Sequence, residues 1–219
     1  MSDTAAAQQF YTRWARIYDL LASAPGVRSW RASAADALAL SPGDTVVEMG
    51  CGTGANFPHL RERVGPDGRV VGVDLTPGML GVARRRVDRA GWDNVGVVAG
   101  DAARPPVRAA DAVVATFLVG MLEDPAAAVG EWCDLLPADG RVVLLNASRS
   151  PRRAAVPLNL LFRLFVRAAA PGGRATSESP ARALEGKIDA ARDALAARAV
   201  SQEERRLGLG FVRLVRGRL

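Results

Sequence analysis

The chain has 219 residues, and 49% of them are apolar, which is enough for one α/β core and too few for two ordinary domains with a linker. Its formal net charge is +6, and Lys187 is the only lysine, so arginines spread along the chain carry the positive charge. A coding bias explains this composition more simply than a nucleic-acid surface, which would need a concentrated basic tract with aromatic residues in it. We therefore expect a single domain that binds no nucleic acid.

The two cysteines and the apolar runs bear on the cellular compartment. Cys51 and Cys133 have neither C-x-x-C nor metal-ligand spacing, so we expect no metal site and a reducing compartment. The N-terminal residues lack the apolar region of a signal peptide, and no run of 18 apolar residues is free of charge. These patterns predict a cytoplasmic protein.

Two helices are expected before the first strand. Residues 5–22 place their large apolar side chains at helical spacing, and Pro25 and Gly26 are expected to end this helix. A second helix runs to about Leu40, and the turn at residues 41–44 leads into a strand.

The first strand is followed by three alternating glycines. The sequence from Glu48 reads E-M-G-C-G-T-G, and a helical pattern begins directly after it. A strand that turns into a helix through glycines brings the backbone close to a ligand, because no Cβ atoms intervene. The helix N-terminus suits an anion, whereas the acid repels phosphate and can accept from an ammonium group. Dinucleotide-binding proteins carry the different spacing G-x-G-x-x-G, and a tight turn without any ligand is the other alternative.

This stretch resembles the first motif of class I S-adenosylmethionine-dependent methyltransferases, E-x-G-x-G-x-G. The resemblance implies that the cofactor is S-adenosylmethionine and that the product formed from it is S-adenosylhomocysteine. It assigns Glu48, Gly50, Gly52 and Gly54 to the cofactor site.

The second predicted strand, residues 69–74, ends in an acid twenty residues past Gly54. Asp74 can accept two hydrogen bonds from a ribose diol at this position. Leu75, which follows it, is assigned to the cofactor as well. Met79 is placed to pack against the adenine face, and a core position fits it equally well.

The third and fourth predicted strands, residues 94–99 and 111–116, each end near a candidate cofactor residue. The resemblance implies that Asp101 accepts from the adenine amino group and that the backbone N–H of Ala102 reaches the ring. An aspartate that only forms a turn after a glycine is the alternative. Thr116 is expected beside the transferred methyl group.

A helix to about Leu136, a fifth strand at 141–145, a helix at 180–197 and a hairpin complete the pattern, with hairpin strands at 199–206 and 211–216. The alternation of five strands with helices predicts a doubly wound parallel sheet. The resemblance implies that the hairpin closes this sheet, which gives an α/β fold: a Rossmann-like, seven-stranded, mostly parallel sheet with helices on both faces and an antiparallel C-terminal hairpin. We expect one methyltransferase domain comprising an N-terminal helical cap (1–40), a cofactor-binding core (44–147), an insertion or lid (151–175) and a C-terminal helix with the hairpin (178–219).

Residues 11–19, Y-T-R-W-A-R-I-Y-D, resemble the N-terminal element of quinone-biosynthesis C-methyltransferases and related phospholipid and thiol methyltransferases. This resemblance implies that Tyr11 and Tyr18 line the acceptor pocket. Aromatic residues that only anchor a helix to the sheet are the alternative.

The stretch 156–167 is apolar except for Asn159, Arg163 and Arg167, which repeat every four residues. One polar stripe on an apolar helix suits a lipophilic acceptor or peripheral contact with an anionic membrane. A cap helix packed on the sheet, or a homodimer contact, fits the pattern equally well.

These patterns predict an S-adenosylmethionine-dependent methyltransferase with a small, lipophilic acceptor, which could be a lipid head group, a quinone, a thiol or a specialised metabolite. Tyr11, Tyr18 and Asn146 are candidates for orienting this acceptor. The only histidine, His59, is expected on a helix away from the strand ends, and the catalytic residues stay unknown. A nucleotide-cofactor oxidoreductase and a non-catalytic cofactor-binding partner protein are the alternatives.

Overall fold

A computed structural model describes residues 25–151 and 180–219. Its seven strands form one sheet in the order β3-β2-β1-β4-β5-β7-β6. The strands are β1 (Thr45–Met49), β2 (Arg69–Asp74), β3 (Val95–Ala99), β4 (Ala112–Thr116), β5 (Arg141–Ala147), β6 (Ser201–Leu207) and β7 (Val212–Arg218). Strands β1 to β5 pair in parallel, and β7 pairs antiparallel with both β5 and β6. The predicted Rossmann-like sheet with its C-terminal hairpin is confirmed.

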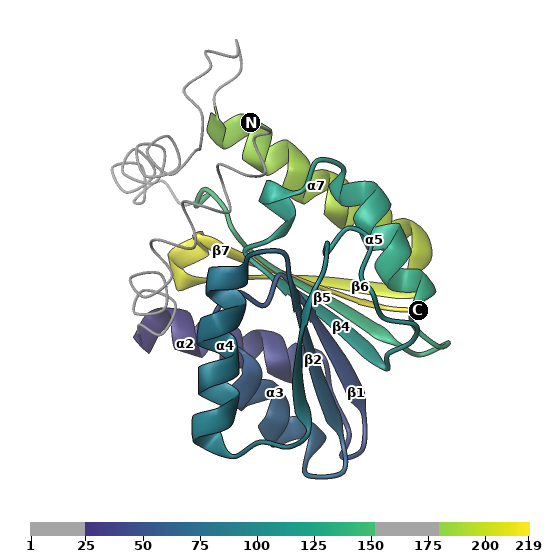
Figure 1. The fold of residues 1–219 in the computed structure, drawn as a ribbon. Helices are drawn as coiled ribbons and strands as arrows, with labels where there is room; N and C mark the ends of the chain where they lie inside the picture. Colours follow the sequence, from purple (N-terminus) through teal and green to yellow (C-terminus); the bar gives the residue numbers. More distant parts are fainter. Residues whose placement is uncertain (1–24, 152–179) are drawn as a thin grey trace.

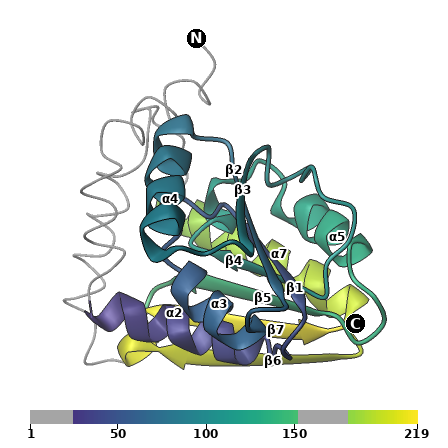
Figure 2. The ribbon, with the colours of Figure 1, turned by 60° about the horizontal axis from the view of Figure 1, so that its bottom comes forward.

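Helices cover both faces of the sheet, as Figures 1 and 2 show. The helices α2, α3 and α4 lie on one face, and α5 and α7 lie on the other. Their bounds are α2 (Pro25–Ala37), α3 (Phe57–Val64), α4 (Pro77–Ala90), α5 (Pro125–Asp134) and α7 (Pro180–Arg198), with short 3-10 turns η1 (Val119–Met121) and η3 (Gly208–Gly210). Because both faces are covered, every residue of the central strand β4 is buried.

Two apolar clusters, one on each face, hold these layers together. One contains Trp132 of α5 and Leu195 of α7, and the other contains Leu38 of α2 and Phe57 of α3. All four side chains are fully buried. Burying such large side chains stabilises the fold by about 1.5–3 kcal/mol each. These clusters fix the helices against the sheet and so support the carboxyl ends of β1, β2 and β4.

Some element bounds differ from those predicted. Pro25 and Gly26, which were expected to end a preceding helix, belong to α2, and the residues before them lie outside the described ranges. Strand β5 continues to Ala147, two residues beyond the prediction, because β7 pairs with it along its whole length. The helices expected at 5–22 and 156–167 lie outside the described residues, and so the predicted division into parts stays a prediction.

Residues 25–151 and 180–219 contain neither a membrane-spanning helix nor a cluster of metal ligands. None of the helices there is both long enough and apolar enough to cross a membrane. No group of histidine, cysteine, aspartate or glutamate side chains in these ranges is placed to hold a metal ion.

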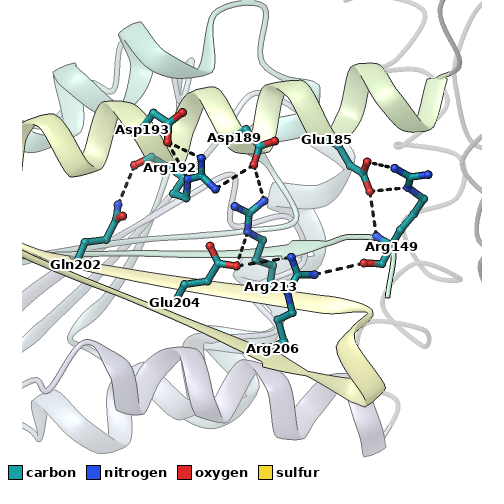
Figure 3. A network of polar contacts seen from close by, with 9 residues as sticks. All are labelled: Arg149, Glu185, Asp189, Arg192, Asp193, Gln202, Glu204, Arg206 and Arg213. Atoms are coloured by element: carbon teal, nitrogen blue, oxygen red, sulfur yellow. Dashed lines mark hydrogen bonds and ion pairs between the residues drawn. The ribbon is translucent and has the colours of Figure 1, made fainter. Parts of the chain in front are cut away.

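A polar network joins α7 to the C-terminal strands (Figure 3). Arg213 of β7 is only 6% exposed, and it donates to Asp189 of α7 at 2.7 Å and contacts Glu204 of β6 at 3.0 Å. Arg149 donates twice to Glu185, at 2.8 and 2.6 Å, and so ties the end of β5 to α7. The other members of the network are Arg192, Asp193, Gln202 and Arg206.

We expect the buried cation of this network to depend on its two carboxylates. The double substitution Asp189→Asn with Glu204→Gln should lower the free energy of unfolding by roughly 2 kcal/mol, because it leaves a buried guanidinium without counter-charge. Arg213→Met should cost less than half of that, because the side chains of Asp189 and Glu204 are 47% and 30% exposed and can be hydrated. Urea unfolding measures both. The surface substitution Arg198→Met is the control, expected to cost no more than about 0.5 kcal/mol, and an Arg213→Met variant less stable than the double variant would contradict this ranking.

Candidate functional site

The three glycines after β1 form a sharp turn. Their φ angles are 65° at Gly50, 54° at Gly52 and 73° at Gly54, a region that other residues seldom adopt. A Cβ atom at Gly54 would lie 2.5 Å from the ring of Phe57, and one at Gly50 would lie 2.6 Å from a methyl carbon of Leu118. The turn therefore needs glycine both for its backbone angles and for its close contacts.

Asp74, the last residue of β2, lies against this turn. Its Oδ2 accepts from the backbone N–H of Gly52 at 2.8 Å, and its Oδ1 accepts from the N–H of Thr76 at 2.8 Å. A carboxylate oxygen can accept more than one hydrogen bond, so each oxygen keeps capacity for a further donor. The carboxylate is thus held in one orientation and can still bind a diol.

The loop after β3 is fixed in a similar way. Asp101 accepts from the N–H of Ala103 at 2.9 Å, which makes a local turn. The indole N–H of Trp132, a fully buried residue of α5, donates to the carbonyl of Ala102 at 2.7 Å. The orientation of this loop therefore depends on α5 as well as on its own sequence.

The carboxyl end of β4 carries a strained residue. Phe117 has φ 58°, in the left-handed region, and its N–H donates to the carbonyl of Leu145 at 2.6 Å. Such a conformation costs a non-glycine residue about 1–3 kcal/mol and occurs most often at functional sites. Thr116, directly before it, is 5% exposed.

These strand ends surround one cavity of about 680 Å³. Its volume lies within the range of sites for small molecules and cofactors. The lining residues are Gly50, Gly52, Asp74, Leu75, Thr76, Met79, Asp101, Ala102, Ala103, Arg104, Thr116, Phe117, Leu118, Met121, Leu122, Glu123, Asp124, Ala127, Ala128 and Glu131. Ligands of open α/β sheets bind at this edge of the sheet.

Glu48 lies near the turn but does not line the cavity. It is fully buried, its Oε1 accepts from the Asn56 side chain at 2.5 Å, and its Oε2 has no hydrogen-bond partner in the described part of the chain. Burial raises the pKa of this carboxyl from an ordinary value of 4.5 to about 8, although the positive charge of Arg31 and the Asn56 hydrogen bond oppose the rise. Near neutral pH, therefore, Glu48 is mostly protonated.

The structure brings most of the predicted cofactor residues to one place. Eight of them line the cavity: Gly50, Gly52, Asp74, Leu75, Met79, Asp101, Ala102 and Thr116. Glu48 and Gly54 do not line it, and neither does Asn146, which is buried on β5. Tyr11 and Tyr18 lie outside the described residues. The binding roles of all these residues stay predictions, and His59 lies on α3, away from the cavity lining.

Two residues behind the cavity were not among those predicted from the sequence. Arg31 of α2 and Asn56 both donate to the hydroxyl oxygen of Thr116, at 2.8 and 3.0 Å. Arg31 could have been noticed because Ala34, Ala35 and Leu38 lie on the same helical face and are buried with it. Asn56 precedes a helix, but its side chain makes no capping hydrogen bond.

Comparison with known proteins defines the class of this chain. The profile of the methyltransferase domain family matches residues 46–140. The chain is 34% identical to the phosphatidylethanolamine N-methyltransferase of Cereibacter sphaeroides over 144 residues, which cover 64% of this chain and 68% of the relative. It is 33% identical to the ubiquinone/menaquinone biosynthesis C-methyltransferase of Xanthomonas campestris, over 64% of this chain and 58% of the relative.

The aklanonic acid methyltransferase of Streptomyces is 35% identical over 106 residues, which are 48% of each chain. This chain thus spans about half the length of that relative. The fold also matches a crystal structure of an S-adenosylmethionine-dependent methyltransferase from Aquifex aeolicus, with a TM-score of 0.57 at 18% identity, over 82% of this chain and 84% of that one.

The chain belongs to the class I S-adenosylmethionine-dependent methyltransferases, as the glycine motif predicted. Within this class it is related to the group that contains the quinone-biosynthesis C-methyltransferases. S-adenosylmethionine is accordingly its cofactor.

The residues around the cavity fit this cofactor. Asp74 offers two fixed carboxylate oxygens to a diol, and Asp101 offers an acceptor for an amino group at the neighbouring strand end. Gly50 and Gly52 line the cavity without side chains, so a ligand can approach their backbone closely. Asp74 and Asp101 would hold the adenosine part, and Thr116 would lie beside the methyl group.

Proposed function

We propose that this protein transfers the methyl group of S-adenosylmethionine to a small acceptor with a large apolar part. One observation carries the proposal: the cavity has carboxylates at the ends of β2 and β3, and an apolar wall beside the end of β4. Phe117, Leu118, Met121 and Leu122 form this wall, and Met121 is 57% exposed. An exposed methionine in an apolar wall suits contact with a flexible, apolar ligand.

The relatives support the class of acceptor. Their names refer to phosphatidylethanolamine, which is a lipid, to ubiquinone and menaquinone, which are quinones, and to aklanonic acid. For the present chain we propose a small-molecule methyl acceptor: a lipid head group, a quinone, a thiol or a specialised metabolite. Peripheral membrane contact, or homodimer contact, through residues 156–167 belongs to the same proposal.

Methyl transfer from S-adenosylmethionine requires little acid–base catalysis by the protein. S-adenosylmethionine supplies an electrophilic methyl carbon when it is bound. The residues of this chain then have to orient the acceptor in line with the bond that breaks and to exclude water. Because a thiolate, a neutral amine or an activated phenolic carbon attacks without a strong base, the proposal does not depend on a general base among the lining residues.

We would test the proposal with methyl-labelled S-adenosylmethionine and an extract of host cells. Label that enters the organic phase only when the protein is present would support a lipid, quinone or other apolar acceptor. Protein-dependent label confined to the aqueous phase would keep the methyl transfer and contradict the apolar acceptor.

The label-transfer experiment, combined with calorimetric binding measurements, addresses the two alternatives from the sequence. Binding of S-adenosylhomocysteine without any transfer of label to the extract would favour a non-catalytic, cofactor-binding partner protein. Calorimetric titration with S-adenosylhomocysteine and with NADH addresses the oxidoreductase, because tighter binding of NADH would contradict the proposed function.

A further inference from the structure

Arg31 occupies an unusual place on α2. The residues three, four and seven positions later, Ala34, Ala35 and Leu38, are at most 1% exposed, so this is the buried face of the helix. Arg31 itself is only 4% exposed. Burying a guanidinium is costly unless polar partners compensate it. A purely structural helix would be more stable with an apolar residue here.

Among the described residues, the Arg31 side chain makes two direct contacts, and both are to residues that line the cavity. Its Nη1 donates to the hydroxyl oxygen of Thr116 at 2.8 Å, and its guanidinium lies over the ring of Phe117, 5.4 Å from the ring centre. Its Nε is buried and has no partner, and no carboxylate of the described residues lies within salt-bridge distance of it. Its direct side-chain contacts are therefore made at the end of β4, while its charge also acts on the buried Glu48 of β1.

The contacts with Arg31 and Asn56 occupy the hydroxyl oxygen of Thr116 as an acceptor. Its oxygen accepts from Arg31 at 2.8 Å and from the Asn56 amide at 3.0 Å, which uses both lone pairs. None of the described residues accepts its own proton, which therefore remains to be donated. Thr116 lines the cavity, so a ligand atom with a lone pair is a suitable acceptor for this proton. Arg31 and Asn56 thus set the direction in which Thr116 donates.

The contact with Phe117 restrains a strained backbone. A left-handed φ at a phenylalanine persists only when its surroundings enforce it. The Phe117 N–H is held by Leu145 of β5, and Arg31 covers its ring from α2. A cation over an aromatic ring contributes about 0.5–2 kcal/mol, with the larger values where the pair is buried. Arg31 therefore acts on both residues at the end of β4.

We propose that Arg31 is a positioning residue: through Thr116 and Phe117 it orders the part of the cavity that takes the amino-acid end of S-adenosylmethionine and the methyl acceptor. The inference rests on the proposed function, because that function places the methyl group beside Thr116. Within the described part of the chain, Arg31 makes no hydrogen bond or ring contact with the ends of β2 and β3, where adenosine would bind. Loss of Arg31 should therefore weaken the binding of the amino-acid end of the ligand and leave the binding of adenosine unchanged.

The test compares two ligands by isothermal titration calorimetry. Arg31→Met, which keeps an apolar body of similar length, should weaken the binding of S-adenosylhomocysteine roughly tenfold, while the affinity for adenosine changes less than about twofold. Thr116→Val should show the same selective loss, because it removes the hydroxyl and keeps the shape. Thr116→Ser should keep the affinity of the parent protein for S-adenosylhomocysteine, because serine keeps the hydroxyl donor.

A matched control separates positioning from a loosened helix. Arg63 of α3 pairs with Asp36 of α2, so Arg63→Met weakens the attachment of α2 without reaching the cavity. This variant should bind both ligands like the parent protein. A similar selective loss in Arg63→Met, an equal loss of both ligands in Arg31→Met, or unchanged binding in Arg31→Met would each overturn the inference. If the parent protein bound adenosine but not S-adenosylhomocysteine, the proposed function itself would fail.

Discussion

Replacing Glu48 by glutamine is expected to remove about 3–4 kcal/mol of pH-dependent destabilisation between about pH 5 and about pH 8. In the folded protein the pKa of Glu48 is raised, chiefly by burial, from 4.5 to about 8. The folded state therefore keeps a proton that the unfolded chain has lost throughout this interval. Each pH unit there lowers the free energy of unfolding by about 1.4 kcal/mol. Above about pH 8 the effect levels off, because both states are then ionised.

Urea unfolding of the parent protein and of Glu48→Gln at several pH values would measure this effect. Every other titrating group is present in both proteins, so the difference between their free energies of unfolding isolates Glu48. Glutamine keeps the acceptor for Asn56, whose amide lies 2.5 Å from Oε1 of Glu48. The parent protein should lose stability relative to the variant as the pH rises. A difference that stays constant with pH would mean that Glu48 is ionised in the folded protein throughout.

The neighbours of Glu48 explain why its state matters for the site. The negative charge of Asp74 on β2 raises the pKa of Glu48, whereas Arg31 of α2, the Asn56 hydrogen bond and Arg86 of α4 lower it. Burial outweighs these lowering effects, so the carboxyl stays neutral under the glycine turn. The motif assigned Glu48 to the cofactor site, but it did not predict that the carboxyl would be fully buried and absent from the cavity lining.

The sequence was sufficient to predict which residues at the strand ends meet at the cavity. Asp74 and Thr116 are the last residues of β2 and β4, and Asp101 lies just beyond β3. Parallel strands place their carboxyl ends at one edge of the sheet. Local pattern and topology are enough to bring such residues together. The same reasoning gave the order of helices and strands, because each element carries its own periodicity.

The residues behind the cavity could not be predicted in this way. Arg31 reaches Thr116 across 85 positions of sequence, and Asn56 reaches it across 60. Such contacts depend on how α2 and the loop before α3 pack against the sheet, which no local pattern specifies. An arginine on an apolar helical face indicates only that some buried partner exists. Its identity comes from tertiary packing.

Asp74→Ala is expected to weaken the binding of S-adenosylhomocysteine by at least about tenfold, as the loss of charge-assisted hydrogen bonds predicts. Two effects contribute to this loss. The carboxylate would no longer bind the ribose diol, and its hydrogen bonds to the N–H groups of Gly52 and Thr76, both of 2.8 Å, would disappear. The first effect is direct recognition, and the second is disorder of the glycine turn.

A ligand comparison separates these two effects by calorimetry. The parent protein should bind adenosine more tightly than 2′,3′-dideoxyadenosine, which lacks the diol, and Asp74→Ala should lose most of this preference. A preference that survives in the variant would contradict the assignment of the diol to Asp74, even if overall affinity fell. Glu62→Ala is a suitable control, because its side chain is 79% exposed on α3 and it should bind both nucleosides like the parent. Loss of the preference in Asp74→Ala alone would place the ribose at the end of β2, and with it the direction in which the cofactor lies across the sheet.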